Sequence, residues 1–195
     1  IAYLSTLGAD KNPLIPHHRI ETAVMGTDAA YTLLRASFFM QNLFEVHRAD
    51  IVEHDEIFVP AGTGKTSFVD ARDLGEVAAV VLTDSGHRNR AYDLTGPEAL
   101  DYHEVASVCS DVLDRPITYP NPSVLAFGTR MRRRGTPLGF VLLMCGIYTT
   151  ARLGLAGRVT DDCGRLLGRP PRDMRTFVDD YAAEFRDDSG AATRS

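Results

Sequence analysis

The sequence has few cysteines, no excess of positive charge and no long apolar segment, and each shortage excludes a class of protein. The three cysteines among 195 residues are odd in number and widely spaced, so they form neither a disulfide framework nor a cysteine metal site. The net charge of −5 argues against wholesale binding to nucleic acid or to an anionic membrane. We therefore expect reduced thiols in a cytoplasmic protein with no metal, no nucleic-acid partner and no membrane partner.

Long apolar runs and internal repeats are also missing. The longest apolar run, residues 138–148, is too short to span a bilayer, and we expect it to form a buried helix of an accessory lobe. The chain begins with Ile rather than Met, and its first four residues already have the character of a buried strand. This abrupt start suggests the hypothesis that the chain is the C-terminal part of a longer protein.

What the sequence does contain is the composition of a globular α/β protein. It is 44% apolar and 24% charged. Short apolar runs at 1–4 and 31–34 predict strands buried on both faces, and the helical spacing from His17 to about Gly26 places a helix between them, as in a βαβ unit. Further strands are expected at 56–59, 66–69, 91–95 and 117–119. Further helices are expected at 42–54, 101–113, 123–134, 160–167 and 174–185. One more helix should begin after Asp73, which we expect to be its N-cap.

The stretch from Tyr31 to Asn42 is the first candidate binding region. Its apolar strand runs directly into a turn that is both polar and aromatic, Arg35-Ala36-Ser37-Phe38-Phe39. Open α/β sheets bind ligands outside the carboxyl ends of their strands, so this turn has the right place and composition for a site. An ordinary core strand followed by an amphipathic helix remains the alternative.

Three other motifs each have a plainer interpretation. Residues 62–66, GTGKT, form half of a phosphate loop, but Val59 stands where that loop requires a glycine, which favours a turn between short strands. His17, His18 and Glu21 share one helical turn and could donate protons or bind a metal, but a helix start without a third ligand is favoured. The cluster 130–134 could contact phosphates or acidic lipid headgroups, although a solvated helix end is the commoner explanation.

Several motifs recur in the order found in a known family. They are YLSTLGAD at 3–10, PHHRIE at 16–21, YTLLR at 31–35 leading to FFMQN at 38–42, SFVDARDL at 67–74 and YDLTGPE at 92–98. Over nearly its whole length the chain resembles the NmrA-like family of atypical short-chain dehydrogenase/reductase proteins. The resemblance implies an α/β fold, the C-terminal part of a Rossmann-type doubly wound parallel sheet with a small, mostly helical lobe. Residues 1–95 would belong to the NAD(P)-binding domain with interleaved lobe strands, 96–186 to the substrate-side lobe, and 187–195 to a disordered tail.

The same resemblance implies a function. The expected activity is NAD(P)H-dependent reduction of a small quinone-like or other conjugated acceptor, with NADP or NAD as cofactor and homo-oligomer formation left open. The alternative is a non-catalytic NAD(P)-binding redox sensor or regulator that acts through a protein partner. The turns after the fifth and sixth strands of the sheet would border the nicotinamide ribose and the nicotinamide, and the residues concerned are Ser5, Thr6, Leu7, Ser37, Phe38, Phe39 and Asn42. Asp70 and Asp73 would hold the junction with the lobe.

Two departures from the dehydrogenase pattern bear on chemistry. The glycine-rich turn that cradles the pyrophosphate is absent from the sequence. Ordinary short-chain dehydrogenases place a Tyr and a Lys four residues apart, whereas the corresponding helix here has His17 and Glu21 at that spacing. Because a carboxylate cannot lower the pKa of a phenol, we leave the catalytic residues unassigned and favour a conjugated acceptor, which itself stabilises charge.

Overall fold

In a computed structural model that describes residues 1–186, the chain folds as two units built from interleaved segments. The first unit comprises Ile1–Met40, Ser67–Ala99 and Arg158–Asp173. The second comprises Gln41–Thr66, Leu100–Gly157 and, among the described residues, 174–186. The disordered tail expected at 187–195 lies outside the described residues.

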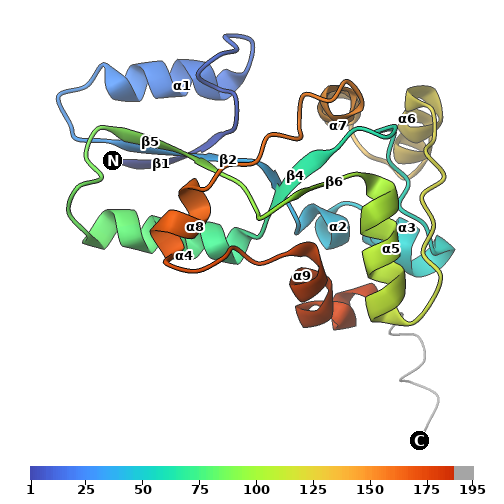
Figure 1. The fold of residues 1–195 in the computed structure, drawn as a ribbon. Helices are drawn as coiled ribbons and strands as arrows, with labels where there is room; N and C mark the ends of the chain where they lie inside the picture. The colour runs from blue at the N-terminus through green and yellow to red at the C-terminus, as the bar shows by residue number, and fades with distance from the viewer. Residues whose placement is uncertain (187–195) are drawn as a thin grey trace, which may run out of the picture. The chain divides into compact units, whose positions relative to one another are not determined.

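The first unit is organised around a parallel sheet of three strands in the order β1-β2-β5 (Figure 1). The strands are β1 (Ala2–Thr6), β2 (Thr32–Ala36) and β5 (Arg90–Leu94). Leu33 and Leu34 face opposite sides of β2 and both are buried, as expected for a central parallel strand covered on both faces. The predicted α/β class with a Rossmann-like parallel sheet is therefore confirmed.

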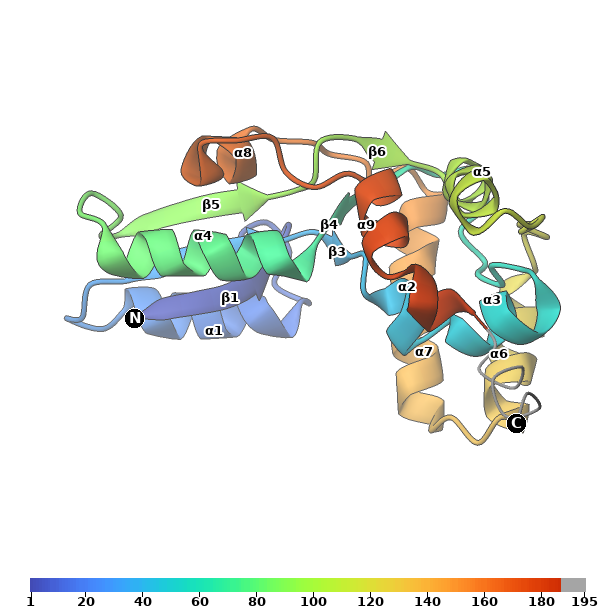
Figure 2. The ribbon, with the colours of Figure 1, turned by 90° about the horizontal axis from the view of Figure 1, so that it is seen from below.

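Helices cover both faces of this sheet. Helix α1 (Pro16–Met25) lies on one face and α4 (Ala71–Thr83) on the other (Figures 1 and 2), while the short α8 (Asp162–Leu167) packs against α4 and β5. The apolar core lies on the α4 side, where the buried residues are Leu34, Ala36, Val69, Leu74, Val77, Val81, Leu94 and Cys163. On the α1 side the one fully buried helix residue is Glu21, which gives this face a polar character.

A second, smaller sheet has the order β3-β4-β6, with β3 at Phe38–Phe39, β4 at Thr66–Val69 and β6 at Ala99–Leu100. The prediction of strands at 56–59 and 117–119 was wrong. These two segments form only an isolated parallel bridge between Glu56 and Thr118. Prolines 116 and 120 flank the second of these segments, and proline has no N–H to donate to a ladder.

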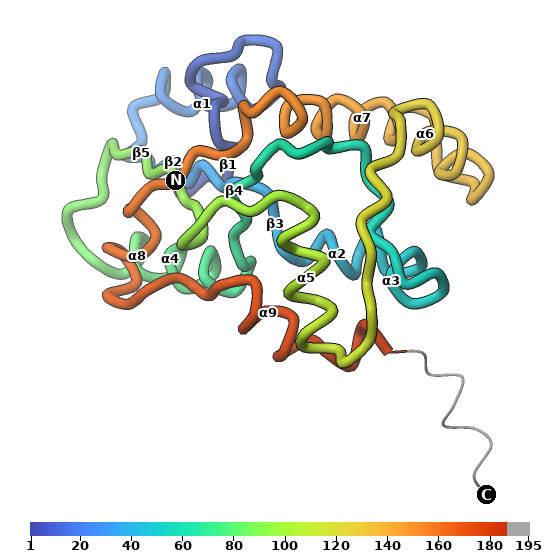
Figure 3. The backbone as a smooth tube through the Cα atoms, turned by 45° about the vertical axis from the view of Figure 1, so that its right-hand side comes forward, coloured from blue at the N-terminus to red at the C-terminus, as the bar shows by residue number. Residues whose placement is uncertain are grey.

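The second unit is mainly helical. The capping box predicted from Asp101 and Glu104 is confirmed, since the Glu104 amide donates to Asp101 over 2.9 Å and the Asp101 amide donates to Glu104 over 2.8 Å. Within this unit α5 packs against α9, and α6 packs against α7 (Figure 3). Its helices are α2 (Asn42–Glu45), α3 (Arg48–His54), α5 (Tyr102–Leu113), α6 (Val124–Arg133), α7 (Leu138–Arg152), α9 (Met174–Asp180) and a 3₁₀ turn at Ala182–Phe185.

Two helix predictions need correction. The helix expected at 42–54 breaks into α2 and α3 at His47, whose buried ring is held by the hydroxyl of Tyr148. Helix α4 is capped by Asp70, which accepts the Arg72 amide at 2.8 Å, and not by Asp73. Asp73 is instead fully buried and accepts hydrogen bonds from Arg169 and Arg172, partners too distant in sequence for a capping pattern to indicate.

The apolar run at 138–148 forms most of α7, but it is less buried than expected. Val141, Met144 and Tyr148 are buried, whereas Leu142 and Leu143 are exposed. No helix in the described part of the chain is both long and apolar enough to cross a membrane.

Candidate functional site

The carboxyl ends of the three parallel strands bring two of the predicted turns together. Thr6, Ala36 and Leu94 are in register at the ends of β1, β2 and β5. Beyond them, the Leu7 amide donates to the Ala36 carbonyl at 2.8 Å and the Ser37 amide donates to the Leu94 carbonyl at 2.9 Å. The turn at 5–7 and the turn starting at Ser37 are therefore neighbours at one edge of the sheet, which is where open α/β sheets bind ligands.

In the first of these turns the side chains differ in role. Ser5 is buried, and its hydroxyl donates to the Glu21 carboxylate over 2.5 Å, so it is already engaged within the protein. Thr6 and Leu7 are half-buried and follow it toward the edge of the sheet. Ser5 thus supports the turn from beneath, while Thr6 and Leu7 retain surface for a ligand.

Ser37 is the predicted site residue with an unmet polar group. Its hydroxyl oxygen is buried, yet it has no hydrogen-bond partner among residues 1–186. Leaving a buried hydroxyl unpaired costs about 1–3 kcal/mol, so such groups usually have a partner supplied by water or ligand. Its position at the carboxyl end of β2 makes it an available polar contact at the sheet edge.

The aromatic pair after Ser37 forms β3 and is ordered by the small sheet. Phe38 and Phe39 pair in parallel with Phe68 and Val69 of β4, and the rings of Phe38 and Phe68 meet edge to face with centroids 5.8 Å apart. Phe39 is partly buried and packs against the apolar core beneath the sheet. Both rings are therefore fixed, each with some surface left exposed.

The remaining predicted residue, Asn42, belongs to the second unit. It is the first residue of α2, and its backbone carbonyl accepts the amides of Val46 and His47. The structure therefore groups the other six predicted residues in the first unit and assigns Asn42 to the helical one.

Beneath the candidate edge lies an ion-pair network that the sequence did not single out. The Arg35 guanidinium donates hydrogen bonds to both carboxylate oxygens of Glu21. The distance is 2.7 Å from Nη2 to Oε2 and 3.0 Å from Nε to Oε1. Arg35 also lies 3.5 Å from Asp10 and 3.9 Å from Asp93. Burial of the Glu21 carboxyl opposes its ionisation, but hydrogen bonds from Arg35 and Ser5 outweigh burial and hold its pKa below the ordinary value. A charged residue on a buried strand was the available signal, because such a charge requires a partner.

The same side of the sheet contains a phenol close to the predicted helix. The Tyr3 hydroxyl of β1 lies 2.7 Å from Nδ1 of His17, in the first turn of α1. Burial and the nearby charge of Glu21 raise the pKa of Tyr3, so this phenol is a weaker acid than a free tyrosine. The arrangement differs from a Tyr-Lys pair, in which the cation lowers the phenol pKa.

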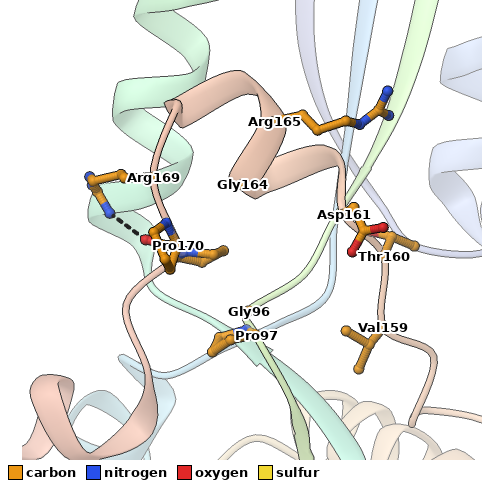
Figure 4. Close-up of a pocket in the computed structure, with 10 residues that line it drawn as sticks. Gly96, Pro97, Val159, Thr160, Asp161, Gly164, Arg165, Arg169 and Pro170 are labelled. Atoms are coloured by element: carbon orange, nitrogen blue, oxygen red, sulfur yellow. Dashed lines mark hydrogen bonds between the residues drawn. The ribbon is translucent and has the colours of Figure 1, made fainter.

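A hollow of about 510 Å³ opens in the first unit beyond the end of β5 (Figure 4). Gly96 and Pro97 lie on one side of it and Gly164 of α8 on the other, with Arg165 directed away. Its two arginines are paired nearby, since Arg169 binds Asp73 and Glu76 and Arg165 pairs with Asp162. None of the predicted site residues lines this hollow.

The glycines at 62 and 64 serve packing. A Cβ on Gly64 would lie 1.8 Å from the Ala151 carbonyl oxygen, and Gly62 has a φ of +66°, so both positions require glycine for steric reasons. Lys65, which a phosphate loop would aim at its ligand, binds Glu104 at 2.9 Å. These contacts agree with the predicted turn.

Metal and thiol chemistry have no support among residues 1–186. No cluster of three or more His, Cys, Asp or Glu residues in that range could hold a metal ion. Burial raises the pKa of both Cys109 and Cys163 to about 12, which keeps these thiols protonated at neutral pH.

Sequence comparison relates the chain to reductases. No protein-family model matches it. It is 36% identical over 162 residues to an NAD(P)H azoreductase of Xenophilus azovorans, a match covering 83% of this chain and 56% of that protein. It is 30% identical over 181 residues to quinone oxidoreductase 2 of Escherichia coli, covering 91% of this chain and 63% of the other. The chain thus spans between half and two thirds of the length of these relatives.

Solved structures give the same grouping. The NADPH complex of the quinone oxidoreductase QOR2 of Escherichia coli superposes with a TM-score of 0.84 at 26% identity, covering 93% of this chain and 65% of that one. The triphenylmethane reductase of Citrobacter sp. in complex with NADP(H) superposes with a TM-score of 0.78 at 27% identity, covering 90% and 63%. The negative transcriptional regulator NmrA in complex with NAD, at 17% identity and a TM-score of 0.66 over 91% and 62%, shares the fold.

Proposed function

Because the chain belongs to the NmrA-like family of atypical short-chain dehydrogenase/reductase proteins, we propose that its protein is an NAD(P)H-dependent oxidoreductase acting on quinone-like or azo-type conjugated acceptors. The observation that carries the proposal is the match to an NAD(P)H azoreductase over 83% of the chain, together with the superposition on a quinone oxidoreductase holding NADPH. We also propose a cytoplasmic location, in keeping with three unpaired cysteines.

The cofactor would lie at the carboxyl edge of the sheet. Thr6 and Leu7 would border the nicotinamide ribose, with Ser5 holding their turn through Glu21. Ser37, Phe38, Phe39 and Asn42 would border the nicotinamide ring. The buried, unpaired hydroxyl of Ser37 fits this assignment, because a polar ligand group would satisfy it. A reduced nicotinamide bound there would supply a hydride.

The residues on the α1 side favour an acceptor that needs little acid catalysis. Tyr3 is the phenol closest to the predicted helix, and its raised pKa makes it a poor proton donor at neutral pH. Glu21 is held ionised by Arg35 and Ser5, so it has no proton to give. Quinones and azo compounds spread the incoming negative charge over their own conjugated atoms, whereas a simple ketone depends on a protein acid.

Steady-state oxidation of NADPH and NADH by the complete gene product, with a quinone, an azo dye and a simple ketone as acceptors, tests the proposal. We expect turnover with the quinone and the azo dye and little with the ketone. Tight cofactor binding without turnover on any acceptor would instead favour the non-catalytic sensor.

Calorimetry of the 195-residue chain alone tests where the cofactor's affinity arises. The sequence contains no G-x-G-x-x-G turn, and that turn with its helix N-terminus normally binds the pyrophosphate. We therefore expect this chain to bind NADPH and NADH weakly by itself and the complete protein to bind one of them tightly. Micromolar binding by the short chain would show that the cofactor site is misplaced.

A further inference from the structure

Charge is distributed very unevenly along this acidic protein. The segment that starts at Arg115 and ends at Thr160, both included, has no Asp, Glu, Lys or His but has seven arginines. Since the whole chain carries −5, the remaining residues carry −12. The basic segment includes the whole of α6 and α7, which form a helical hairpin in the second unit (Figure 3). An asymmetry of this size points to a surface that meets a negatively charged partner.

The hairpin is anchored by one set of apolar side chains and exposes another. Phe127, Met131, Val141, Met144 and Tyr148 are buried and hold the two helices in place. The outward set is unusually apolar for a protein surface, with exposed fractions of 80% for Leu125, 63% for Leu142, 57% for Leu138, 57% for Leu143 and 40% for Phe140. Clustered exposed apolar residues of this kind mark interaction surfaces.

The arginines of the hairpin divide into two groups. Arg130 and Arg134 bind Asp50 at 2.8 Å and 2.9 Å, and these contacts hold α6 against α3. Arg132 and Arg133 are exposed and have no carboxylate partner among residues 1–186; the one hydrogen bond of the Arg132 side chain in that range goes to the Thr136 carbonyl. Two arginines at the end of α6 are thus left with uncompensated positive charge.

These two arginines share a groove with the exposed leucines. The groove between α6 and α7 has a volume of about 760 Å³, and both Arg132 and Arg133 line it together with Leu125, Leu138 and Leu142. Positive charge beside an exposed apolar helix face is the pattern of a helix that lies in the interface of a membrane, with its apolar face in the acyl region and its arginines among the headgroups.

We propose that the α6–α7 hairpin docks the protein on the surface of an anionic lipid bilayer. The hairpin would lie in the interface without crossing it, because α7 has 15 residues and a span needs about 20. A second copy of this chain fits less well, because this protein carries −5 overall and a contact face made of this hairpin would present positive charge on both copies. The whole-chain charge of −5 predicted no membrane partner, but docking depends on the charge of the contact face.

Co-sedimentation of the chain with vesicles tests the proposal directly. Without any cofactor, we expect binding to vesicles of phosphatidylcholine containing phosphatidylglycerol, weak binding to pure phosphatidylcholine, and release from the anionic vesicles at high salt. Replacing both Arg132 and Arg133 by Gln should weaken binding about 30-fold, since each arginine near an anionic surface contributes about a factor of five. The double change Leu125→Asn with Leu142→Asn should weaken it by about tenfold or more.

A matched control lies in the first unit. Leu82 is 68% exposed and Arg88 is also exposed, so Leu82→Asn with Arg88→Gln removes one leucine and one arginine side chain from a different surface. Binding reduced by the hairpin variants and unchanged by the control supports the proposal. The proposal is overturned if the chain does not bind anionic vesicles, or if the hairpin variants bind them as strongly as the wild type. Concentration-dependent dimerisation that the leucine variants abolish, without vesicle binding, would assign the face to a second copy and also overturn it.

Discussion

The two units stabilise buried polar groups in different ways. The first unit buries carboxylates and pairs each with arginine: Glu21 with Arg35, Asp70 with Arg72, and Asp73 with Arg169 and Arg172. Glu21 lies within α1 and Arg35 within β2, whereas Asp70 caps α4 and Asp73 lies in its first turn. Only the Glu21 pair is connected to a turn of the candidate cofactor edge, through the hydrogen bond from Ser5.

Among the residues of the second unit that the structure describes, the comparable pairing is Asp50 with Arg130 and Arg134, whereas the buried centre is uncharged. His47, Tyr148 and Tyr102 are fully buried and linked by hydrogen bonds from the imidazole through one phenol to the next. Burial lowers the pKa of His47 to about 4 and raises the pKa of both tyrosines. The first unit should therefore lose stability when a side chain of a buried ion pair is removed. The second unit should lose stability when a buried neutral group, such as His47, becomes charged.

The largest effect should come from removing a charge in the first unit. Arg35→Ala leaves Glu21 buried without its main partner, and breaking a buried pair in this way costs about 3–5 kcal/mol. Denaturant unfolding measures the loss, with Arg19→Ala on the exposed face of α1 as control. Adding Glu21→Gln to Arg35→Ala should recover part of the stability, and a double variant no more stable than the single one would contradict this account.

The next effect is pH-dependent and belongs to the second unit. The folded pKa of His47, about 4, lies below the ordinary value of 6.5, so neutral His47 stabilises the fold above pH 6.5 and this contribution is lost as the pH falls toward 4. The loss should reach about 3 kcal/mol, with Asp50 opposing and Arg134 reinforcing the shift.

Unfolding of the wild type and of His47→Gln between pH 7 and pH 4 measures this term. The variant should lose less stability over the range, because it has no imidazole to protonate. The exposed His54 of α3 offers the matched control, and His54→Gln should keep the wild-type profile. If the free energy of unfolding falls equally with pH in all three proteins, protonation of His47 does not cause the loss of stability.

A smaller effect on activity is expected at the candidate site. Phe39→Ala in the complete protein should weaken cofactor binding or slow hydride transfer by about tenfold, or about 1.4 kcal/mol, because the ring would lose its contact with the nicotinamide. Phe39 also packs on the core, so Phe39→Leu serves as a variant that keeps apolar packing without the ring. Unchanged affinity and turnover in Phe39→Ala would refute the assignment.

An even smaller effect on chemistry is expected at Glu21. Glu21→Gln should leave the reductase activity per folded molecule within about tenfold, since this carboxylate is held by Arg35 and Ser5 and has no proton to give. A loss of about a thousandfold, or about 4 kcal/mol, would show that α1 carries the chemistry.

The smallest effect should come from an exposed pair in the second unit. Arg175 and Asp111 lie 2.8 Å apart, but their side chains are 56% and 59% exposed. Arg175→Ala should therefore change the free energy of unfolding by less than about 1 kcal/mol. A larger loss would mean that exposure does not separate this pair from the buried pairs of the first unit.

Local patterns predicted local features well. Short apolar runs located β1 and β2, the pair Asp101 and Glu104 located the start of α5, and Val59 excluded a phosphate loop. Six of the seven candidate site residues lie in the first unit, at or after the ends of β1 and β2, and their role in cofactor binding stays a prediction. The sequence was less informative at His47, where the helical pattern did not show the break between α2 and α3 or the hydrogen bond to Tyr148, a residue 101 positions away.

The sequence by itself determined the fold class, the places of β1 and β2 and the cap of α5, because these depend on residues within a few positions of one another. Only the tertiary structure decided that Arg35 holds Glu21, that Asp73 serves Arg169 and Arg172 instead of capping α4, and that Leu142 faces outward. An apolar or charged residue specifies what kind of neighbour it needs. Which neighbour it meets depends on how distant segments pack in space, and no local pattern contains that information.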